Sequence, residues 1–279
     1  IGFEVESVTI KGDDLSNIVI GHIQQMDVHP NAERLRVAQV DVGEKTVQIV
    51  TAATNVNTGD NIPVSLPGAT LANGLNITES ELRGEASFGM MCSAVECGLT
   101  DTSPGVWVLP PNVPVGADFI EYAQLKDTVL DIAILPNRGD CLSLYGLARE
   151  CAALYNVPIT FKATEPTWHA EDTPVTCTLN PDVCSVYYAQ KITGIQHQHT
   201  PVVDQVRLYL SGERPINWIV DLTNLVMLET GHPMHAFDAN GVSNITVTYG
   251  ANQSVTLLND KEVKVNENVP VVQLNQGVG

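Results

Sequence analysis

The chain has 279 residues, which is long enough for roughly two domains, each with a hydrophobic core of its own. Its hydrophobic content of 44% and charged content of 16% indicate ordered globular structure and exclude an intrinsically disordered protein. The formal net charge of −18 is opposite to the basic footprint of a free-standing RNA-binding protein. Either the chain binds RNA only weakly, or a partner supplies the positive charge that RNA binding needs.

The sequence carries no sign of a membrane anchor or a metal site. No apolar run reaches the roughly 18 residues that a transmembrane helix needs, and no signal sequence follows Ile1, so we expect the chain to begin inside a longer protein. The six cysteines form no CxxC pair, and their spacing favours neither zinc nor a disulfide framework. Neither histidine pair favours a metal, because His197 and His199 lie on a predicted surface loop and His232 and His235 straddle a proline. We expect a cytoplasmic protein with reduced cysteines, no metal and no membrane partner.

Short alternating runs predict an antiparallel barrel in the N-terminal part. Residues 18–26 are predicted to form a strand, residues 36–42 and 46–51 alternate between apolar and polar side chains, and residues 75–79 and 89–93 complete the set, with Gly, Asn and Pro residues between the runs. Residues 62–69 should form an edge strand, because Pro63 and Pro67 cannot donate hydrogen bonds to a ladder. These lengths fit an OB-like barrel of five strands from residue 18 to about residue 120.

The barrel carries an ordered set of loop motifs: HPNAERL at 29–35, IVTAATNV at 49–56, VSLPGA at 64–69, LRG at 82–84 and SFGMMCS at 87–93. From composition alone, their prolines and glycines would only turn corners. In order and spacing, the set resembles the tRNA-binding domain that occurs in several aminoacyl-tRNA synthetases and in free-standing tRNA-binding proteins. The resemblance implies tRNA contacts, for which the candidates are the only basic residues between positions 14 and 120: Arg34, Arg36, Lys45 and Arg83.

A strand, a turn and a helix are predicted after the barrel. Residues 128–134 are β-branched and apolar, residues 136–140 form the turn, and Asp140 or Ser143 can cap a helix over 142–154. The RGD tripeptide in the turn could be read as a cell-adhesion signal, but three residues carry little information. This stretch is similar to a characteristic segment of the beta subunits of bacterial phenylalanyl-tRNA synthetases. There it belongs to a small domain that bridges the tRNA-binding and editing parts.

The C-terminal part is predicted to mix strands with two short helices. The polar stretch 164–173 should be a linker. Strands are predicted at 175–179, 187–195, 217–221, 242–248 and 254–265. One helix should cover 202–210 and end at Gly212. A second helix should begin with Thr223 or Asn224 as its N-cap and stop at the next glycine.

Four polar residues of this part are candidates for a functional site: Arg214, Thr223, Asn224 and His235. Arg214 could hold a phosphate or a carboxylate. Thr223 and Asn224 could orient a water molecule or bind an ester, and His235 could act as a base. Each has a structural alternative, namely an ion pair for the arginine, a helix cap for the threonine and a buried position for the histidine.

The surrounding segment closely resembles the editing domain of the same beta-subunit family, which cleaves mischarged tyrosine from phenylalanine tRNA. By this resemblance the four residues line the editing pocket. Arg214 would position the acceptor end, and Thr223 and Asn224 would bind the ester region or the water. His235 would orient the water or act as a weak general base.

Chain geometry predicts that the four residues converge on one cleft between two sheets. The strand predicted at 217–221 would span about 15 Å, with Arg214 before it and Thr223 and Asn224 at its far end. The helix that follows would reverse the path, and the turn after it would bring His235 back towards the strand. A pocket of this kind would suit a small ligand.

The resemblance implies an α+β multidomain fold with an OB-fold β-barrel, a small α/β bridging domain and a mixed α/β editing domain. The bridging domain would comprise residues 1–13 and 123–165, the tRNA-binding barrel residues 14–122, and the editing domain residues 174–279. The editing domain is expected to be incomplete at its C-terminus, because an acidic residue of the family's site should follow Gly279.

The implied function is that of part of a phenylalanine–tRNA ligase beta subunit. It would support aminoacylation of tRNA(Phe) with an alpha subunit, in a heterotetramer of two alpha and two beta subunits, and would hydrolyse mischarged tyrosyl-tRNA(Phe). This chain should hold no cofactor; ATP and Mg²⁺ would serve the complete enzyme in the alpha subunit, so this chain alone should not aminoacylate. The alternatives are a non-enzymatic tRNA-binding or scaffold module with an inactive editing site, and a free-standing deacylase.

Overall fold

A computed structural model describes most of the chain. The described residues are 2–160, 175–196, 198–257, 261–275 and 277–278. The chain forms two compact units, the first from residues 1–159 with 198–234 and the second from residues 160–197 with 235–279. The linker predicted at 164–173 lies outside the described residues.

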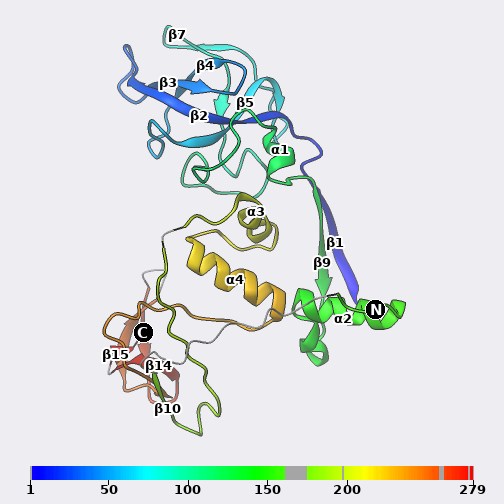
Figure 1. Cartoon of the computed structure of the whole chain (residues 1–279), viewed down its shortest axis with the longest axis vertical. Coiled ribbons are helices and arrows are strands. Elements are labelled where there is room, and N and C mark those ends of the chain that lie inside the picture. The colour runs from blue at the N-terminus through cyan, green and yellow to red at the C-terminus, as the bar shows by residue number, and fades with distance from the viewer. Residues whose placement is uncertain (1, 161–174, 197, 258–260, 276, 279) are drawn as a thin grey trace. The chain divides into compact units, whose positions relative to one another are not determined.

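A curved antiparallel sheet of five strands forms the N-terminal part of the first unit (Figure 1). In the order of the sheet, its strands are β4 (Thr46–Thr51), β3 (Arg36–Asp41), β2 (Ser16–Val28), β5 (Asn61–Thr70) and β8 (Met90–Met91). A separate hairpin consists of β6 (Ser80–Leu82) and β7 (Glu85–Ser87). The strands predicted at 18–26, 36–42 and 46–51 are confirmed, because period-two alternation places one face of each strand in the core.

Two strand predictions in this sheet need correction. β5 is not an edge strand, since it lies between β2 and β8. Its prolines are tolerated because β8 pairs only with Val64 and Ser65, so no N–H is required of Pro63 or Pro67 on that side. Pro63 instead accepts a hydrogen bond from the backbone N–H of Cys92, at 2.9 Å. The strand predicted at 75–79 is reduced to a single bridge between Asn76 and Thr70, and the next strand begins at Ser80.

Two hydrophobic clusters hold the sheet. The first cluster consists mainly of side chains from the strands of the sheet. Its fully buried members are Ile23, Ala38, Val40, Ile49, Val56, Ile62 and Val64. The other extends from the sheet over α1 (Phe119–Tyr122) to α3 (Val202–Leu210). Trp107 is central to it, because its ring packs edge-on against Phe119 at 5.5 Å and Tyr209 at 5.9 Å between ring centroids. The helix α3 is therefore packed on the N-terminal sheet although it lies far along the chain.

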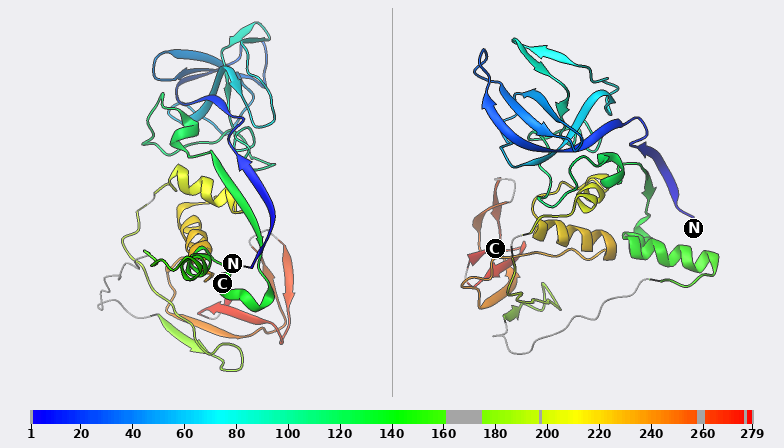
Figure 2. Two further views of the ribbon diagram at one scale, coloured as in Figure 1. Left: turned by 90° about the vertical axis from the view of Figure 1, so that its right-hand side faces the viewer. Right: turned by 45° about the horizontal axis from the view of Figure 1, so that its top comes forward.

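A two-stranded ladder connects the sheet to the helical part of the first unit. β1 (Glu4–Lys11) pairs antiparallel with β9 (Asp127–Ala133), and both views in Figure 2 show the two strands side by side. After β9, the 3₁₀ helix η1 (Pro136–Cys141) leads into α2 (Leu144–Tyr155). The predicted strand, turn and helix are confirmed, and Ser143 is the N-cap, since its side chain accepts a hydrogen bond from the N–H of Gly146 at 3.0 Å.

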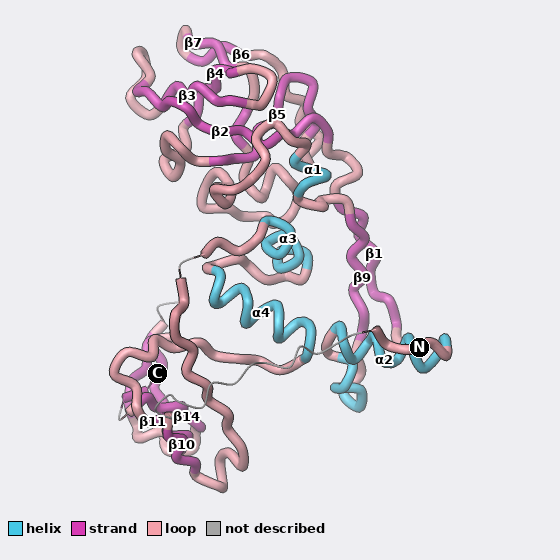
Figure 3. Tube along the Cα trace, viewed as in Figure 1, coloured by secondary structure: helices cyan, strands magenta, loops and turns pink. Residues whose placement is uncertain are grey.

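The helices α3 and α4 (Trp218–Thr230) follow one another in the first unit (Figure 3). The helix predicted at 202–210 is confirmed as α3. The strand predicted at 217–221 is wrong, because Asn217 caps α4 by accepting hydrogen bonds from the N–H groups of Ile219 and Val220. Thr223 and Asn224 therefore lie inside the helix and do not cap it. The helix ends at Gly231, whose φ of +80° is the left-handed conformation that favours glycine.

The second unit contains a four-stranded sheet and a hairpin. The sheet order is β10 (Thr176–Leu179), β11 (Asn244–Tyr249), β14 (Pro270–Leu274) and β15 (Gly277–Val278). β10 and β11 are parallel and the remaining neighbours antiparallel. The hairpin is formed by β12 (Gln253–Thr256) and β13 (Glu262–Val265). The strands predicted at 175–179 and 242–248 are confirmed, and the run predicted at 254–265 is two paired strands, with 258–260 outside the described residues.

The strand predicted at 187–195 is wrong, since these residues are irregular. Tyr188 is 93% exposed, and no strand pairing includes this segment in the part of the chain that the structure describes. A strand needs a partner as well as a pattern. Among the described residues, no helix has the length and apolarity needed to cross a membrane.

Candidate functional site

Arg214 lies in the loop between α3 and α4 and is exposed. Among the described residues, no ion pair or hydrogen bond of its guanidinium group is found. The ion-pair alternative is therefore not realised in that part of the chain. An exposed guanidinium with its donors available suits bidentate binding of a phosphate or a carboxylate.

Thr223 and Asn224 are half-buried neighbours on α4. The Thr223 hydroxyl donates a hydrogen bond to the carbonyl of Val220 at 2.7 Å, which is a common pattern for threonine within a helix. Its oxygen keeps lone pairs that can accept from a water or a ribose hydroxyl. The helix thus presents a hydroxyl and an amide about one turn after its N-terminus.

His235 belongs to the second unit and is exposed, so the buried-histidine alternative is wrong. Its ring is stacked on that of Phe237, with 6.1 Å between the ring centroids and 27° between the planes. Arg214, Thr223 and Asn224 belong to the first unit. The convergence of all four residues on one cleft stays a prediction.

Asp221 is a residue of this region that the sequence analysis did not single out. It is 2% exposed on the first turns of α4. Its carboxylate accepts hydrogen bonds from the hydroxyl of Thr200 at 2.5 Å and from the backbone N–H of Ile216 at 2.7 Å. The signal available in the sequence was an aspartate inside the apolar run IVDL, where a charged group needs partners if it is buried.

The four basic residues of the barrel fall into different environments. The guanidinium of Arg36 donates to the carbonyls of Ala53 and, at 2.8 Å, Val56, so it fastens a loop of the sheet. Arg34 and Arg83 are exposed. Lys45 lies at the opposite end of the β3–β4 hairpin, since Arg36 pairs with Thr51 at one end and Asp41 with Thr46 at the other.

A buried histidine ties together the two loops that carry Arg34 and Arg83. His29 is 3% exposed, and its Nε2 donates a hydrogen bond to the carbonyl of Leu82 at 2.9 Å. Its Nδ1 accepts from the backbone N–H of Asn31 at 3.0 Å. The Asn31 amide in turn donates to the carbonyl of Arg83 at 3.1 Å. His29 therefore acts as a neutral structural residue that orders the loop containing Arg34.

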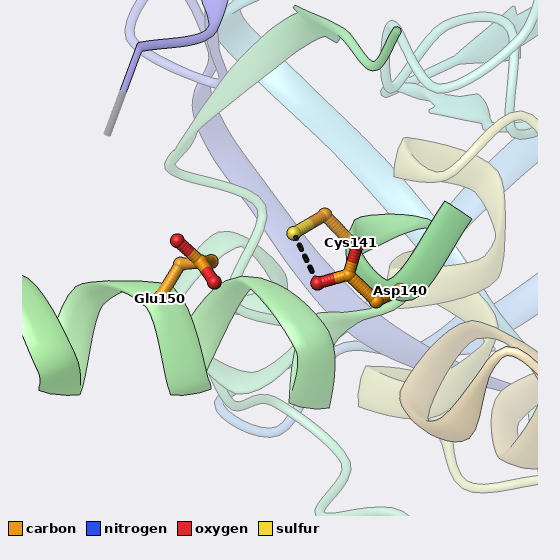
Figure 4. A group of neighbouring side chains, drawn as sticks. All are labelled: Asp140, Cys141 and Glu150. Atoms are coloured by element: carbon orange, nitrogen blue, oxygen red, sulfur yellow. Dashed lines mark hydrogen bonds between the residues drawn. The ribbon is translucent and has the colours of Figure 1, made fainter. Parts of the chain in front are cut away.

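One acidic cluster has the composition of a metal site. Figure 4 shows its side chains, Asp140 and Cys141 from η1 and Glu150 from α2, whose ligand atoms lie within 4.8 Å of one another. The guanidinium of Arg138 already occupies the cluster, with Nη2 3.0 Å from Asp140, 2.6 Å from Glu150 and 3.1 Å from the Cys141 sulfur. Its hydrogen bonds to Asp140 lower the pKa of that carboxyl to about 2. These residues thus satisfy one another and do not fit a metal ion.

The same contacts bear on the RGD tripeptide. Arg138 also lies over the ring of Phe3, with 5.3 Å from the guanidinium carbon to the ring centroid. Arg138 and Asp140 are bound to each other through two hydrogen bonds. A cell-adhesion signal would need both side chains free, so the tripeptide is a structural turn.

An apolar groove of about 460 Å³ lies elsewhere in the first unit. β9, α2 and α4 all contribute to its walls, for example through Leu130, Ile132, Leu147, Met227 and Leu228. None of the four candidate site residues lines it. The groove is therefore distinct from the predicted editing residues.

Two protein families match separate parts of the chain. Residues 18–118 match the putative tRNA binding domain, which covers the curved sheet and the loops with the basic residues. Residues 183–278 match the B3/4 domain, which covers α3, α4 and all four candidate site residues.

Whole proteins similar to the chain carry a consistent name. The phenylalanine–tRNA ligase beta subunit of Syntrophus aciditrophicus is 42% identical over 240 residues, which are 85% of this chain and 30% of that protein. The beta subunit of Clostridium acetobutylicum is 40% identical over 283 residues, covering 98% of this chain and 36% of that protein. The chain thus spans about a third of the length of these relatives. A solved structure of a MetRS related protein from Pyrococcus horikoshii matches 39% of this chain and 87% of that chain with 20% identity, but its TM-score of 0.27 carries no argument.

Proposed function

Because the chain belongs to the family of phenylalanine–tRNA ligase beta subunits, we propose that it forms the tRNA-binding and editing part of such a subunit. Residues 14–122 are an OB-fold barrel for tRNA, which the curved five-stranded sheet supports. Residues 1–13 and 123–165 form the bridging domain between the barrel and the editing domain, and the pairing of β1 with β9 supports this assignment. Residues 174–279 belong to the editing domain.

The editing reaction is hydrolysis of the ester between tyrosine and phenylalanine tRNA. Water attacks the carbonyl carbon, the bond to the terminal ribose oxygen breaks, and a proton passes to that oxygen. The observation that carries this proposal is the exposed Arg214 guanidinium, with its donors available among the described residues, in the loop before the helix with Thr223 and Asn224. These three lie in the part of the chain that matches the B3/4 domain.

Each residue has a role that its geometry permits. Arg214 binds a phosphate of the acceptor end. Thr223 and Asn224 hold the ester region or the water. His235 orients the attacking water or takes its proton as a weak base, and its exposed imidazole is open to solvent for this role. Positioning of water is the main contribution, because it can account for a large part of the barrier without a covalent intermediate.

Editing complements a synthetic site that tolerates the extra hydroxyl of tyrosine. An apolar pocket rejects an added hydroxyl only weakly, whereas a site that hydrogen-bonds the hydroxyl rejects the analogue lacking it strongly. In the complete enzyme the alpha subunit carries the synthetic site with ATP and Mg²⁺, in a heterotetramer of two alpha and two beta subunits that acts on tRNA(Phe). The chain alone does not aminoacylate.

The test is His235→Ala in the complete enzyme, compared with the unchanged enzyme. We expect hydrolysis of tyrosyl-tRNA(Phe) to slow by about 10²-fold, while phenylalanine activation stays nearly the same. Both rates are measured on the same preparation, by deacylation of preformed tyrosyl-tRNA and by pyrophosphate exchange. If both activities fall together, His235 is structural. If neither falls, Thr223→Ala and Asn224→Ala become the decisive variants, and an unchanged rate in these as well leaves a non-enzymatic module.

A further inference from the structure

Asp221 is the one carboxylate that is buried among the described residues. Removing a carboxylate from water costs several kcal/mol unless hydrogen bonds and local charge compensate. Two donors contact it, the Thr200 hydroxyl at 2.5 Å and the Ile216 N–H at 2.7 Å. It also lies in the first turns of α4, where the helix dipole favours a negative charge. A buried charge satisfied in this way fixes the groups that satisfy it.

One of these groups, the backbone N–H of Ile216, restricts the position of the loop that contains Arg214. Ile216 follows Arg214 by two residues, and Pro215 between them has a restricted φ. Anchoring the Ile216 N–H to Asp221 therefore also limits where the backbone of Arg214 can lie. Because Asp221 precedes Thr223 on the same helix, the anchor sets the arginine loop relative to the helix that carries Thr223.

The other group is itself held by a chain of hydrogen bonds. The indole N–H of Trp107 donates to Gln205 at 2.9 Å, and the Gln205 amide donates to the carbonyl of Thr200 at 2.8 Å. Thr200 is 7% exposed. Water cannot easily replace Asp221 as the partner of its hydroxyl, so breaking this hydrogen bond would be costly. The carboxylate thus has a rigid neighbour on one side and the arginine loop on the other.

Electrostatics place Arg214 in the same neighbourhood. Burial raises the pKa of Tyr209, while the positive charge of Arg214 lowers it and the negative charge of Asp221 raises it. Both charges therefore act on one phenol at the end of α3. This supports a short path from the buried carboxylate to the loop with the guanidinium.

We propose that Asp221 is a positioning residue for the editing reaction, which holds the Arg214 loop against α4 so that the guanidinium meets the acceptor end beside Thr223. The inference rests on the proposed function. Asp221 touches neither substrate nor water in this role. A loop displaced by about 1 Å can cost about 10²-fold in rate, so the effect on hydrolysis is large although the residue is remote from the ester.

The test uses the complete enzyme with two kinds of change. Asp221→Ala removes both acceptors, and we expect kcat/KM for tyrosyl-tRNA(Phe) hydrolysis to fall about 10²-fold. Thr200→Val removes only the hydroxyl and should lower it about 10-fold, while Thr200→Ser restores the hydroxyl and the rate. Phenylalanine activation should stay within about twofold in all three. The matched control is Asp118→Ala, which removes an exposed aspartate that caps α1, and it should leave hydrolysis unchanged.

A double-mutant cycle separates positioning from general destabilisation. In an Arg214→Ala background, Asp221→Ala should lower hydrolysis by less than about twofold more, because the arginine it positions is already gone. Multiplicative losses, or a fall in phenylalanine activation equal to the fall in hydrolysis, would overturn the proposal. A Thr200→Val enzyme with the normal rate would overturn it as well.

Hydrogen exchange tests the anchor without any activity. The Ile216 amide should exchange about 10-fold faster in Asp221→Ala, with the amides of α2 unchanged. If this amide is unaffected, the anchor does not exist in solution and the inference fails while the proposed function stands. If the amide responds but His235→Ala, Thr223→Ala and Asn224→Ala all leave hydrolysis unchanged, the proposed function fails, and with it the role of Asp221 in editing.

Discussion

Arg34 and Arg36 are two residues apart, yet their guanidinium groups have different surroundings. Arg36 donates to two backbone carbonyls of the loop after β4, whereas Arg34 is exposed. The sequence shows that both are basic and cannot show which carbonyls will lie nearby after folding. The same holds for Asp221 and His29, each of which has one partner far along the chain, Thr200 for Asp221 and Leu82 for His29. The charge of each side chain was thus known from the sequence, but its hydrogen-bond partners in the folded chain were not predictable.

These environments give a paired prediction. Arg36→Ala should lower the free energy of unfolding by about 1–3 kcal/mol, because two partly buried carbonyls lose their donor. Arg34→Ala should change it by less than about 0.5 kcal/mol. In contrast, Arg34→Ala should weaken tRNA binding. The slope of log Kd against log salt concentration should fall by about one, because one phosphate contact is lost. Urea unfolding and tRNA titration at several salt concentrations measure the two effects, and equal stability loss in both variants would contradict the assignment.

Cys92 gives a prediction about alkaline pH. Burial raises the pKa of its thiol from the ordinary value of 9.0 to about 12. Below pH 9 the folded and unfolded states both keep the proton; between pH 9 and about 12 only the unfolded state loses it. The free energy of unfolding should therefore fall as pH rises through this window, by up to about 1.4 kcal/mol per pH unit from this thiol.

The measurement is urea unfolding at pH 8, 9 and 10 for the original chain and for Cys92→Ala. The variant should be less stable at pH 8 because of lost packing, but its stability should decline less steeply above pH 9. Parallel pH profiles would show that the thiol ionises equally in both states.

At the scale of elements, strands with a turn on each side were predictable, and so was the end of α4 at Gly231, but its start at Trp218 was not. The runs at 36–42 and 46–51 alternate and end in turn residues, so each local signal agrees with the sheet. The run from Trp218 to Asp221 is rich in β-branched residues, which favours a strand locally. The cap formed by Asn217 and the packing of α4 on α3 and α2 override that preference.

The start of α4 can be tested through its cap. Asn217→Ala should lower the free energy of unfolding by about 1 kcal/mol, because the N–H groups of Ile219 and Val220 lose their acceptor. Asn217→Ser keeps an acceptor and should restore most of the loss. Thermal unfolding of the two variants decides between cap and strand, since a strand at this position would make them equally stable.

At the scale of the whole molecule, charge limits what the barrel can do by itself. The net charge is −18, and of the four basic residues in the barrel one is committed to backbone carbonyls. We predict that the chain alone binds tRNA with a Kd of about 10⁻⁴ to 10⁻⁶ M at physiological salt, in the range of non-specific binding. Fluorescence anisotropy of labelled tRNA at 50 and 200 mM salt measures this. Submicromolar affinity that is unchanged by salt would contradict the prediction.

The β1–β9 ladder has a consequence for the order of folding. Lys11 pairs with Asp127, so the whole curved sheet and α1 lie in the loop that this pair closes. Closing so long a loop costs entropy before any ladder hydrogen bond forms. A folded sheet brings the two ends of the loop together and removes most of that cost. The pairing of β1 with β9 should therefore form only after the sheet has folded. The amides of β1 and β9 should be the last to become protected from hydrogen exchange.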